Sequence, residues 1–130
     1  MENSTVFERF NNGRLALPDA ETAFADIPWS AHPVFRGVEL KHIVPAAQTG
    51  GAFSFHLVRL APGAVIGRHV HEQQLETHEV IGGSGTCLSN GASLEYQPGT
   101  VSILPKNSPH EVTAGADGLC LFAKFFPALC

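Results

Sequence analysis

The sequence predicts an all-β fold, a single small antiparallel β-barrel or sandwich, from two observations. Short segments rich in β-branched and aromatic residues follow one another from residue 34 to residue 126, as is typical of strands. Gly, Pro and Asn separate these segments, and helical periodicity is almost absent. Many short strands at regular spacing indicate a barrel or sandwich. A length of 130 residues suits one such domain with a real core.

The first 30 residues are the least regular part of the sequence. Asn11-Asn12-Gly13 marks a turn, and residues 20–26 form at most a short helical turn. We therefore divide the chain into an irregular N-terminal extension, residues 1–30, and a barrel, residues 31–130. We expect the extension to pack on a partner subunit.

The expected strands of the barrel follow in order. The first two are separated by the Thr49-Gly50-Gly51 turn, and Asn90-Gly91 is a strong hairpin signal because both residues accept positive φ. The last segment, 119–126, is apolar throughout, which predicts a central strand buried on both faces. The predicted strands are 38–44, 52–60, 65–71, 76–81, 85–89, 93–96, 101–104, 111–113 and 119–126.

Four side chains that can bind a metal lie close together in the second half of the chain. His69 and His71 are two residues apart, a spacing that places both imidazoles on one face of a strand. Glu76 begins the next segment, so a strand, a loop and a returning strand bring its carboxylate back toward the two imidazoles. His110 is a fourth candidate ligand. The pattern predicts a metal site.

Two motifs built on these residues resemble those of the cupin superfamily. The first motif is complete: Gly63, five residues, His69-x-His71, four residues, Glu76, six residues, Gly83. The second is Gly99, five residues, Pro105-x-Asn107-x-x-His110, with Asn107 in place of a glycine and Ala114 in place of a terminal Asn. The resemblance implies a jelly-roll barrel, or double-stranded β-helix, that holds a metal with its three motif histidines and Glu76. Function must be argued from the site, because this fold serves many chemistries.

The ligand set limits the metal and the molecules that it would bind. Three imidazoles and one carboxylate, with no thiolate, suit divalent Fe, Mn, Ni, Co or Zn. We expect one such ion per chain, and the ligands leave its identity open. Four protein donors leave two adjacent positions on an octahedral ion, at a net charge of +1. A small anionic or chelating molecule, such as an enolate, hydroxy acid or keto acid, would be stabilised there.

Further site residues are predicted from their position. His78 lies two residues beyond Glu76 and so shares its strand face. We expect it in the metal pocket as the catalytic candidate, orienting Glu76 or acting as an acid or base. Arg59 and His56 are the substrate-binding candidates, although the sequence does not assign the face of His56, His42 or Tyr96.

Three functions from different classes are compatible with this site. The first is a metal-dependent enzyme acting on a small oxygenated metabolite, either an Fe(II) dioxygenase or a non-redox isomerase, epimerase or lyase that works through an enolate. The second is a metal-anchored module that binds or senses a small molecule without catalysis. The third is a structural barrel with a vestigial site. We favour the enzyme, because all four ligands are present and no output domain is recognised, and leave its reaction type open.

Charge and composition exclude other partners. The net charge is −4 and the pI is near 5.9, with scattered Lys and Arg, so nucleic acid is not expected to bind. No secretory signal or apolar run of about 20 residues is present, so we expect no membrane association and a cytoplasmic location. Hydrophobic residues make up 44% and charged residues only 15%, which predicts a homodimer that covers apolar surface.

Overall fold

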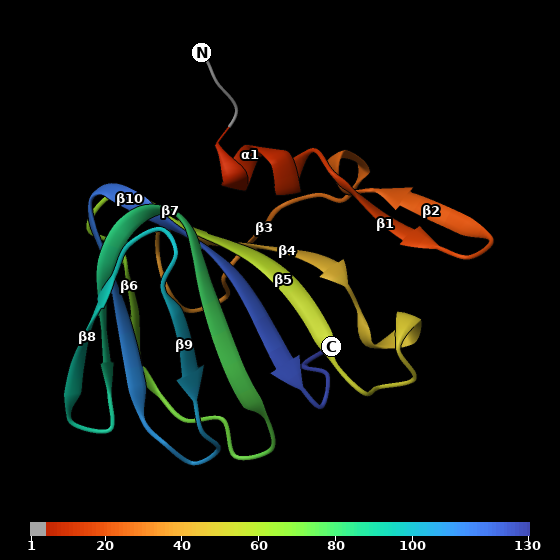
Figure 1. The fold of residues 1–130 in the computed structure, drawn as a ribbon. Coiled ribbons are helices and arrows are strands. Elements are labelled where there is room, and N and C mark those ends of the chain that lie inside the picture. The colour runs from red at the N-terminus through yellow and green to blue at the C-terminus, as the bar shows by residue number, and fades with distance from the viewer. Residues whose placement is uncertain (1–4) are drawn as a thin grey trace.

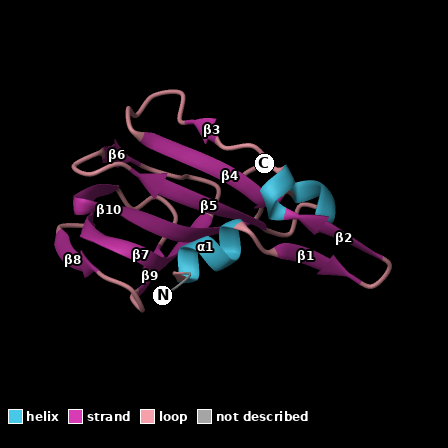
Figure 2. Cartoon of the chain, turned by 90° about the horizontal axis from the view of Figure 1, so that it is seen from above, coloured by secondary structure: helices cyan, strands magenta, loops and turns pink. Residues whose placement is uncertain are grey.

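Antiparallel strands make up most of the computed structural model, which describes residues 5–130 (Figure 1 and Figure 2). Two long strands, β7 (Leu75–Ser89) and β10 (His110–Phe126), pair along their length at its centre. The fold is the predicted all-β jelly roll. The shorter barrel strands are β3 (Ser30–Ala31), β4 (Val38–Val44), β5 (Ser54–Leu60), β6 (Val65–His69), β8 (Ala92–Tyr96) and β9 (Val101–Leu104).

The barrel strands form one hydrogen-bonded sheet of eight strands. This sheet bends into two layers, called the first and second sheets below, and each long strand contributes to both. The first part of β10 pairs with β6 and with the second part of β7, which also carries β8. The last part of β10 pairs with β5 and with the first part of β7, which also carries β9. β3 and β4 extend this second sheet beyond β5. The two sheets enclose an apolar interior, in which Leu121, Val112 and Tyr96 are fully buried.

The continuity of β7 and β10 differs from the prediction, which placed a loop at residues 82–84 and a break before residue 119. The structure bends the strands there instead, and the β7–β10 register shifts between Ala114 and Leu119. Gly83 has φ +70°, and a Cβ at this residue would lie 2.1 Å from the carbonyl oxygen of Gly118. Glycine therefore permits a bend within a continuous strand rather than ending it.

Two other predictions about the strands are confirmed. Asn90 and Gly91 have φ +49° and +83° and form the turn of the β7–β8 hairpin. The segment 119–126 is central, with β5 on one side and β7 on the other. It is buried on both faces, since Leu121 and Phe122 both have little exposure.

The N-terminal extension is more regular than predicted. It contains α1 (Val6–Asn11), the hairpin of β1 (Arg14–Leu17) and β2 (Ala20–Ala23), and the 3₁₀ turn η1 (Phe24–Asp26). Among residues 5–130, no helix is long and apolar enough to cross a bilayer.

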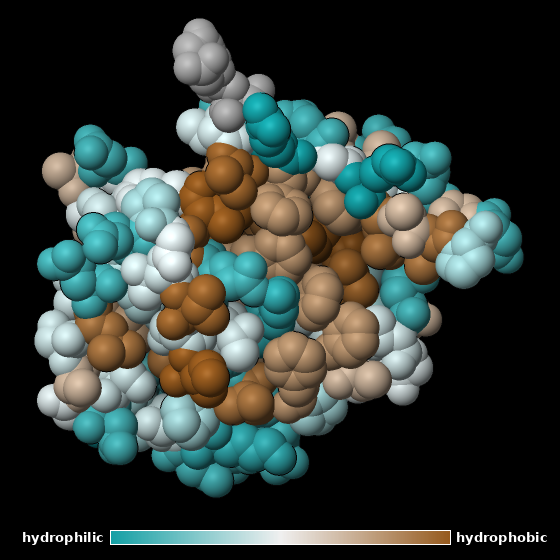
Figure 3. All heavy atoms as spheres, in the orientation of Figure 1, coloured by the Kyte–Doolittle hydropathy of each residue, from teal (hydrophilic) through white to brown (hydrophobic). Residues whose placement is uncertain are grey.

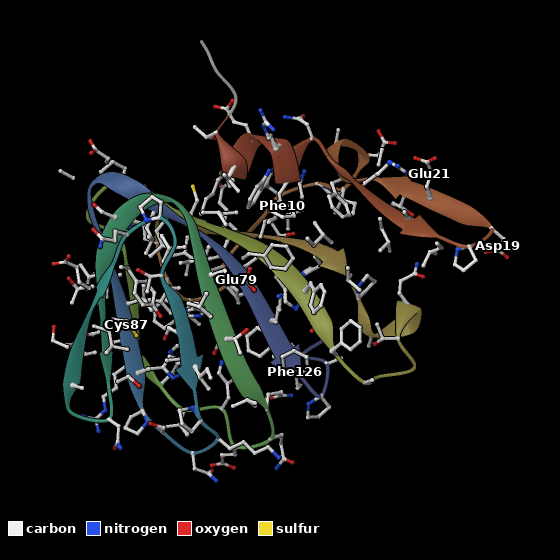
Figure 4. All side chains as sticks on the ribbon, in the orientation of Figure 1. Phe10, Asp19, Glu21, Glu79, Cys87 and Phe126 are labelled. Carbon is white, nitrogen blue, oxygen red and sulfur yellow. The ribbon has the colours of Figure 1, made fainter. Side chains whose placement is uncertain are left out.

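The extension packs on the outer face of the second sheet of its own barrel. Phe24 forms a cluster there with Leu57 and Phe122. Phe10, labelled on α1 in Figure 4, packs against Phe122 with 5.0 Å between the ring centroids. The chain thus covers apolar surface of its own sheet, and packing of the extension on a partner subunit stays a prediction.

Candidate metal centre

A cavity of about 330 Å³ lies inside the barrel, at the small end of the range for small-molecule sites. Its walls are mainly aliphatic and aromatic, and its polar lining consists of Glu76 and the histidines of the chain. Neither lysine nor arginine is among the described residues that line it. The histidines are His32, His42, His56, His69, His71, His78 and His110, of which all but His32 come from the barrel strands or the turn after β6.

Three elements bring the four predicted ligands together at one end of the cavity. His69 ends β6 and is the cross-strand partner of His110, the first residue of β10. His71 follows β6 in the turn, and Glu76 is the second residue of β7. One ligand-capable atom from each of the four lies within 4.8 Å of the others.

The contacts within this group leave two buried polar atoms that face each other without a partner. Oε1 of Glu76 lies 3.3 Å from Nε2 of His110 and 3.4 Å from Nε2 of His71. Oε1 of Glu76 and Nε2 of His110 are buried and have no hydrogen-bond partner within the described chain. Unpaired buried polar atoms are costly. A cation bound between them would satisfy both, so the donor set fits a divalent metal.

Backbone contacts fix the orientation of two of the imidazoles. Nδ1 of His69 lies 2.7 Å from the carbonyl oxygen of Gly67, and Nδ1 of His110 lies 3.2 Å from that of Ser108. A carbonyl oxygen can only accept, so each Nδ1 carries a hydrogen, and in the neutral ring each Nε2 has a free lone pair. These lone pairs are the ones required of a metal ligand.

His78 holds the other oxygen of Glu76. Its Nε2 lies 2.6 Å from Oε2 of Glu76, and its Nδ1 lies 2.8 Å from the hydroxyl of Tyr96. The carboxylate accepts from Nε2–H, so in the neutral ring Nδ1 accepts from the Tyr96 hydroxyl. The three buried side chains form a chain of hydrogen bonds that aims Oε1 of Glu76 at the histidine cluster.

Electrostatics keep the carboxylate charged and one imidazole neutral. Burial alone would raise the pKa of Glu76, but the neighbouring His78 and His110 outweigh it, so this pKa lies well below its ordinary value. Burial lowers the pKa of His71, opposed in part by Glu76. An ionised carboxylate and a neutral imidazole are the forms that bind metals.

The two substrate-binding candidates lie on opposite faces of β5. His56 is buried and lines the cavity. Arg59 does not reach it: its side chain pairs with Glu39 at 2.8 Å and lies over the ring of Trp29 on the outer face of the sheet. Residues an odd number of positions apart on a strand face opposite sides, and His56 and Arg59 are three apart. Arg59, predicted as a substrate-binding candidate, therefore lies outside the cavity that holds the candidate ligands.

Sequence reasoning left two residues unassigned that the structure places near the site. Tyr96 is fully buried and supports His78. His42 is the cross-strand partner of His56, and the β4–β5 register shifts between His42 and Val44, so counting from the Thr49-Gly50-Gly51 turn does not give this pairing. Tyr96 faces Gly85 across the β7–β8 hairpin, and here counting outward from the Asn90-Gly91 turn does give the register.

Comparison with known proteins agrees with this fold. The sequence matches the family model described as a cupin domain over residues 56–122. It is also 28% identical over 76 residues to an oxalate-binding protein of Thermotoga maritima, and the match spans 58% of this chain and 63% of that protein's length.

Solved structures share the barrel at low sequence identity. A predicted oxalate decarboxylase from Thermotoga maritima superposes with a TM-score of 0.73 and 22% identity over 79% of this chain and 95% of the other. KdgF from Halomonas sp. gives 0.70 and 20% over 79% and 90%. The polyketide cyclase RemF from Streptomyces resistomycificus gives 0.68 and 20% over 79% and 75%. At these identities the likeness establishes the fold.

Proposed function

We propose, from the premise that this chain belongs to the cupin family, that it binds one divalent transition metal and uses it to act on a small oxygenated metabolite. The ligands in this proposal are His69, His71, Glu76 and His110. When bound, the ion would supply Lewis-acid charge that attracts and polarises oxygen atoms of the metabolite.

One observation carries the proposal. Oε1 of Glu76 and Nε2 of His110 face each other at 3.3 Å without a hydrogen bond, although both are buried. Leaving two such atoms unpaired costs roughly 1–3 kcal/mol each, and a shared cation removes that cost. The surrounding chain supports this use, because Gly67, Ser108 and His78 hold the ligands in the required orientation.

The role of His78 in the proposal is to position Glu76. Both of its ring nitrogens are engaged, one by Glu76 and the other by Tyr96. A ring held at both ends has no free nitrogen for proton exchange with a substrate. We therefore favour the orienting role over the acid or base role that the sequence also allowed.

The reaction type follows from the metal in the proposal. Iron would favour an Fe(II) dioxygenase, and a redox-inactive ion would favour an isomerase, epimerase or lyase. A second candidate function is binding of a small carboxylate without catalysis. The match to an oxalate-binding protein supports it, and it uses the same site.

Metal analysis of wild-type protein and two variants tests the proposal. We expect one equivalent of metal after purification without air, and none in His69→Ala or His110→Ala, because each variant removes one ligand. The barrel should stay folded by circular dichroism, since its apolar core carries its stability. His32→Asn is the matched control: it lines the cavity but its Nδ1 binds the backbone of Val34 and Phe35.

Full metal occupancy in either ligand variant would refute the ligand assignment. Oxygen uptake by the iron-loaded protein with keto acids or catechols would select the dioxygenase. Binding of oxalate without turnover of any of these compounds would select the binding module.

A further inference from the structure

A second group of polar side chains borders the cavity, away from the proposed metal ligands. His42 on β4 and His56 on β5 are cross-strand partners, and both line the cavity. Ala123 on β10 pairs with His56 on one side and with His78 on the other. Across the four strands, the residues in one row are therefore His78, Ala123, His56 and His42.

The distance between the two rings is that of a hydrogen bond and is too short for two ligands of one metal ion. Nδ1 of His42 lies 2.7 Å from Nδ1 of His56, and Sγ of Cys130 lies 3.7 Å from the first of these atoms. Two imidazoles on one tetrahedral zinc, at about 2.0–2.1 Å each, would hold their nitrogens about 3.3 Å apart. A separation of 2.7 Å is a hydrogen-bond length.

The contacts of Ser54 determine which of the two histidines donates this hydrogen bond. Ser54 is buried, its Oγ accepts from the N–H of Leu129 at 2.8 Å, and it lies 2.7 Å from Nε2 of His56. The hydroxyl hydrogen is satisfied only if it points at Nε2 of His56. His56 then carries its hydrogen on Nδ1 and donates it to Nδ1 of His42.

The chain of hydrogen bonds ends at the outer nitrogen of His42. Its Nδ1 accepts from His56, so the hydrogen of the neutral ring is on Nε2. Within residues 5–130 this nitrogen has no hydrogen-bond partner, and the ring lines the cavity and is partly exposed. His56 is kept neutral, because burial and then His42 lower its pKa to about 4.

The space between His42 and the metal centre is apolar. The ring of Phe125 lies 5.5 Å from that of His56 and 5.2 Å from that of His71, measured between centroids. Val58 and Leu121 also line the cavity. With no cation among the described lining residues, a second carboxylate at this end would have no charge partner.

We propose that His42 donates a hydrogen bond from Nε2 to an uncharged acceptor oxygen at the far end of a ligand whose near end chelates the metal. The ligand class is a 2-oxo or 2-hydroxy acid with an apolar body and a terminal hydroxyl or carbonyl group. This inference rests on the proposed function, because the chelating end needs the metal.

A pair of probes that differ by one hydroxyl tests the inference. Phenylpyruvate and 4-hydroxyphenylpyruvate share the chelating 2-oxo acid and an apolar ring. We would measure the Kd of each by calorimetry on the full chain loaded with Zn²⁺. The hydroxyl should tighten binding to the wild type by about 3- to 10-fold, the usual range for one hydrogen bond.

Two variants separate this contact from a general effect on the cavity. In His42→Phe the gain from the hydroxyl should fall to about 1-fold, while one equivalent of Zn²⁺ is kept. His42→Gln retains an N–H donor and should recover part of the gain. Equal gains in wild type and His42→Phe would overturn the inference, as would absence of any gain in the wild type.

The zinc stoichiometry of the same proteins provides two further outcomes. A second equivalent of Zn²⁺ that is lost only in His42→Phe would make the histidine pair a metal site and overturn the inference. Failure of the proposed function looks different, because the wild type would then bind no Zn²⁺ and His110→Ala would change nothing. That result would overturn the inference together with the metal centre that it needs.

Discussion

Glu76 has two oxygens with different partners. Oε2 is held by His78, and Oε1 faces the histidine cluster without a hydrogen bond. A freely rotating carboxylate would form hydrogen bonds with the neighbouring histidines in turn. A carboxylate that binds a metal ion must instead keep one orientation relative to the other ligands. Tyr96 and His78 supply that direction from the barrel interior.

Replacement of His78 should weaken metal binding without abolishing it. His78→Ala removes the hydrogen bond to Oε2 of Glu76, and losses of this kind lower metal affinity by about 10- to 100-fold. Competition with a chromophoric chelator would measure the change. Tyr96→Phe removes only the hydrogen bond between the Tyr96 hydroxyl and His78. It should lower the metal affinity by a smaller factor.

Two outcomes would contradict this role. Complete loss of the metal in His78→Ala would make His78 a ligand. Unchanged affinity in the same variant would leave His78 without a part in the site.

His56 should make the stability of the metal-free protein depend on pH. Its pKa is lowered from 6.5 to about 4, by burial and then by His42, with Glu76 opposing. The unfolded chain therefore binds a proton at a higher pH than the folded chain does. The titration of His56 therefore leaves the free energy of unfolding unchanged above pH 6.5. It lowers this free energy by up to about 3 kcal/mol as the pH drops from 6.5 to 4.

Urea denaturation between about pH 4 and pH 7 would measure this dependence. In His56→Gln the slope should be shallower over the same range, because Gln does not titrate. His42, Cys130 and Glu76 surround this ring and are unchanged in the variant. Identical slopes in the two proteins would contradict the prediction.

Site residues can be predicted from the sequence where their positions depend on short spacings along the chain. His69 and His71 could be assigned from their two-residue spacing, although β6 ends at His69 and His71 lies in the turn after it. His78 could be assigned because two residues separate it from Glu76. His42 and Arg59 could not, since their faces depend on the register between β4 and β5 and on which face of that sheet encloses the cavity. Register is a tertiary property.

At the scale of the elements, the bends of β7 and β10 create the barrel. Each strand belongs to one sheet at its start and to the other at its end. Gly83 and Gly118 face each other at the bend, where any side chain would meet backbone. Periodicity alone predicts two short strands here, because a glycine-rich bend and a loop look the same in sequence.

Gly83→Ala should destabilise the barrel far more than Gly91→Ala. Both residues have positive φ, so both substitutions cost about 1 kcal/mol or more from backbone strain. A Cβ at Gly91 meets nothing within 4 Å, whereas one at Gly83 lies 2.1 Å from the carbonyl oxygen of Gly118. Urea denaturation of the two variants isolates the clash, and equal losses would show that the bend can relax.

The N-terminal elements show where sequence patterns are weakest. α1 has six residues and none of them is buried, too few for a stable helix in isolation. Its position depends on contacts such as that of Phe10 with Phe122, which is distant in sequence. A short element held by distant partners leaves little periodicity to detect.

At the scale of the whole molecule, apolar surface remains exposed after the extension has packed. Figure 3 shows apolar side chains gathered over β9 and beneath α1. Val101 and Ile103 on β9 are 68% and 64% exposed. Among the described strands β9 pairs with β7 alone, so its other edge offers unpaired backbone groups. Such an edge, if left uncovered, invites association.

We predict a homodimer that uses the β9 surface. A specific contact would bury on the order of 800 Å² or more per subunit. Light scattering at micromolar concentration should give twice the chain mass, and Ile103→Glu should shift the protein to monomer by placing a charge in the contact. Leu88→Glu is the control, because Leu88 is also exposed but lies on the other sheet. A monomeric wild type would contradict the prediction.

The position of β10 in the sheet order has a consequence for how the protein is made. A ribosome releases β5, β6 and β7 well before the strand that lies between them, and β10 then joins all three. Until it does, Glu76 and His69 have no scaffold to hold them together, and His110 is not yet available. The four proposed ligands therefore come together only when nearly the whole barrel has formed, and a nascent chain that still lacks β10 cannot assemble the proposed metal site.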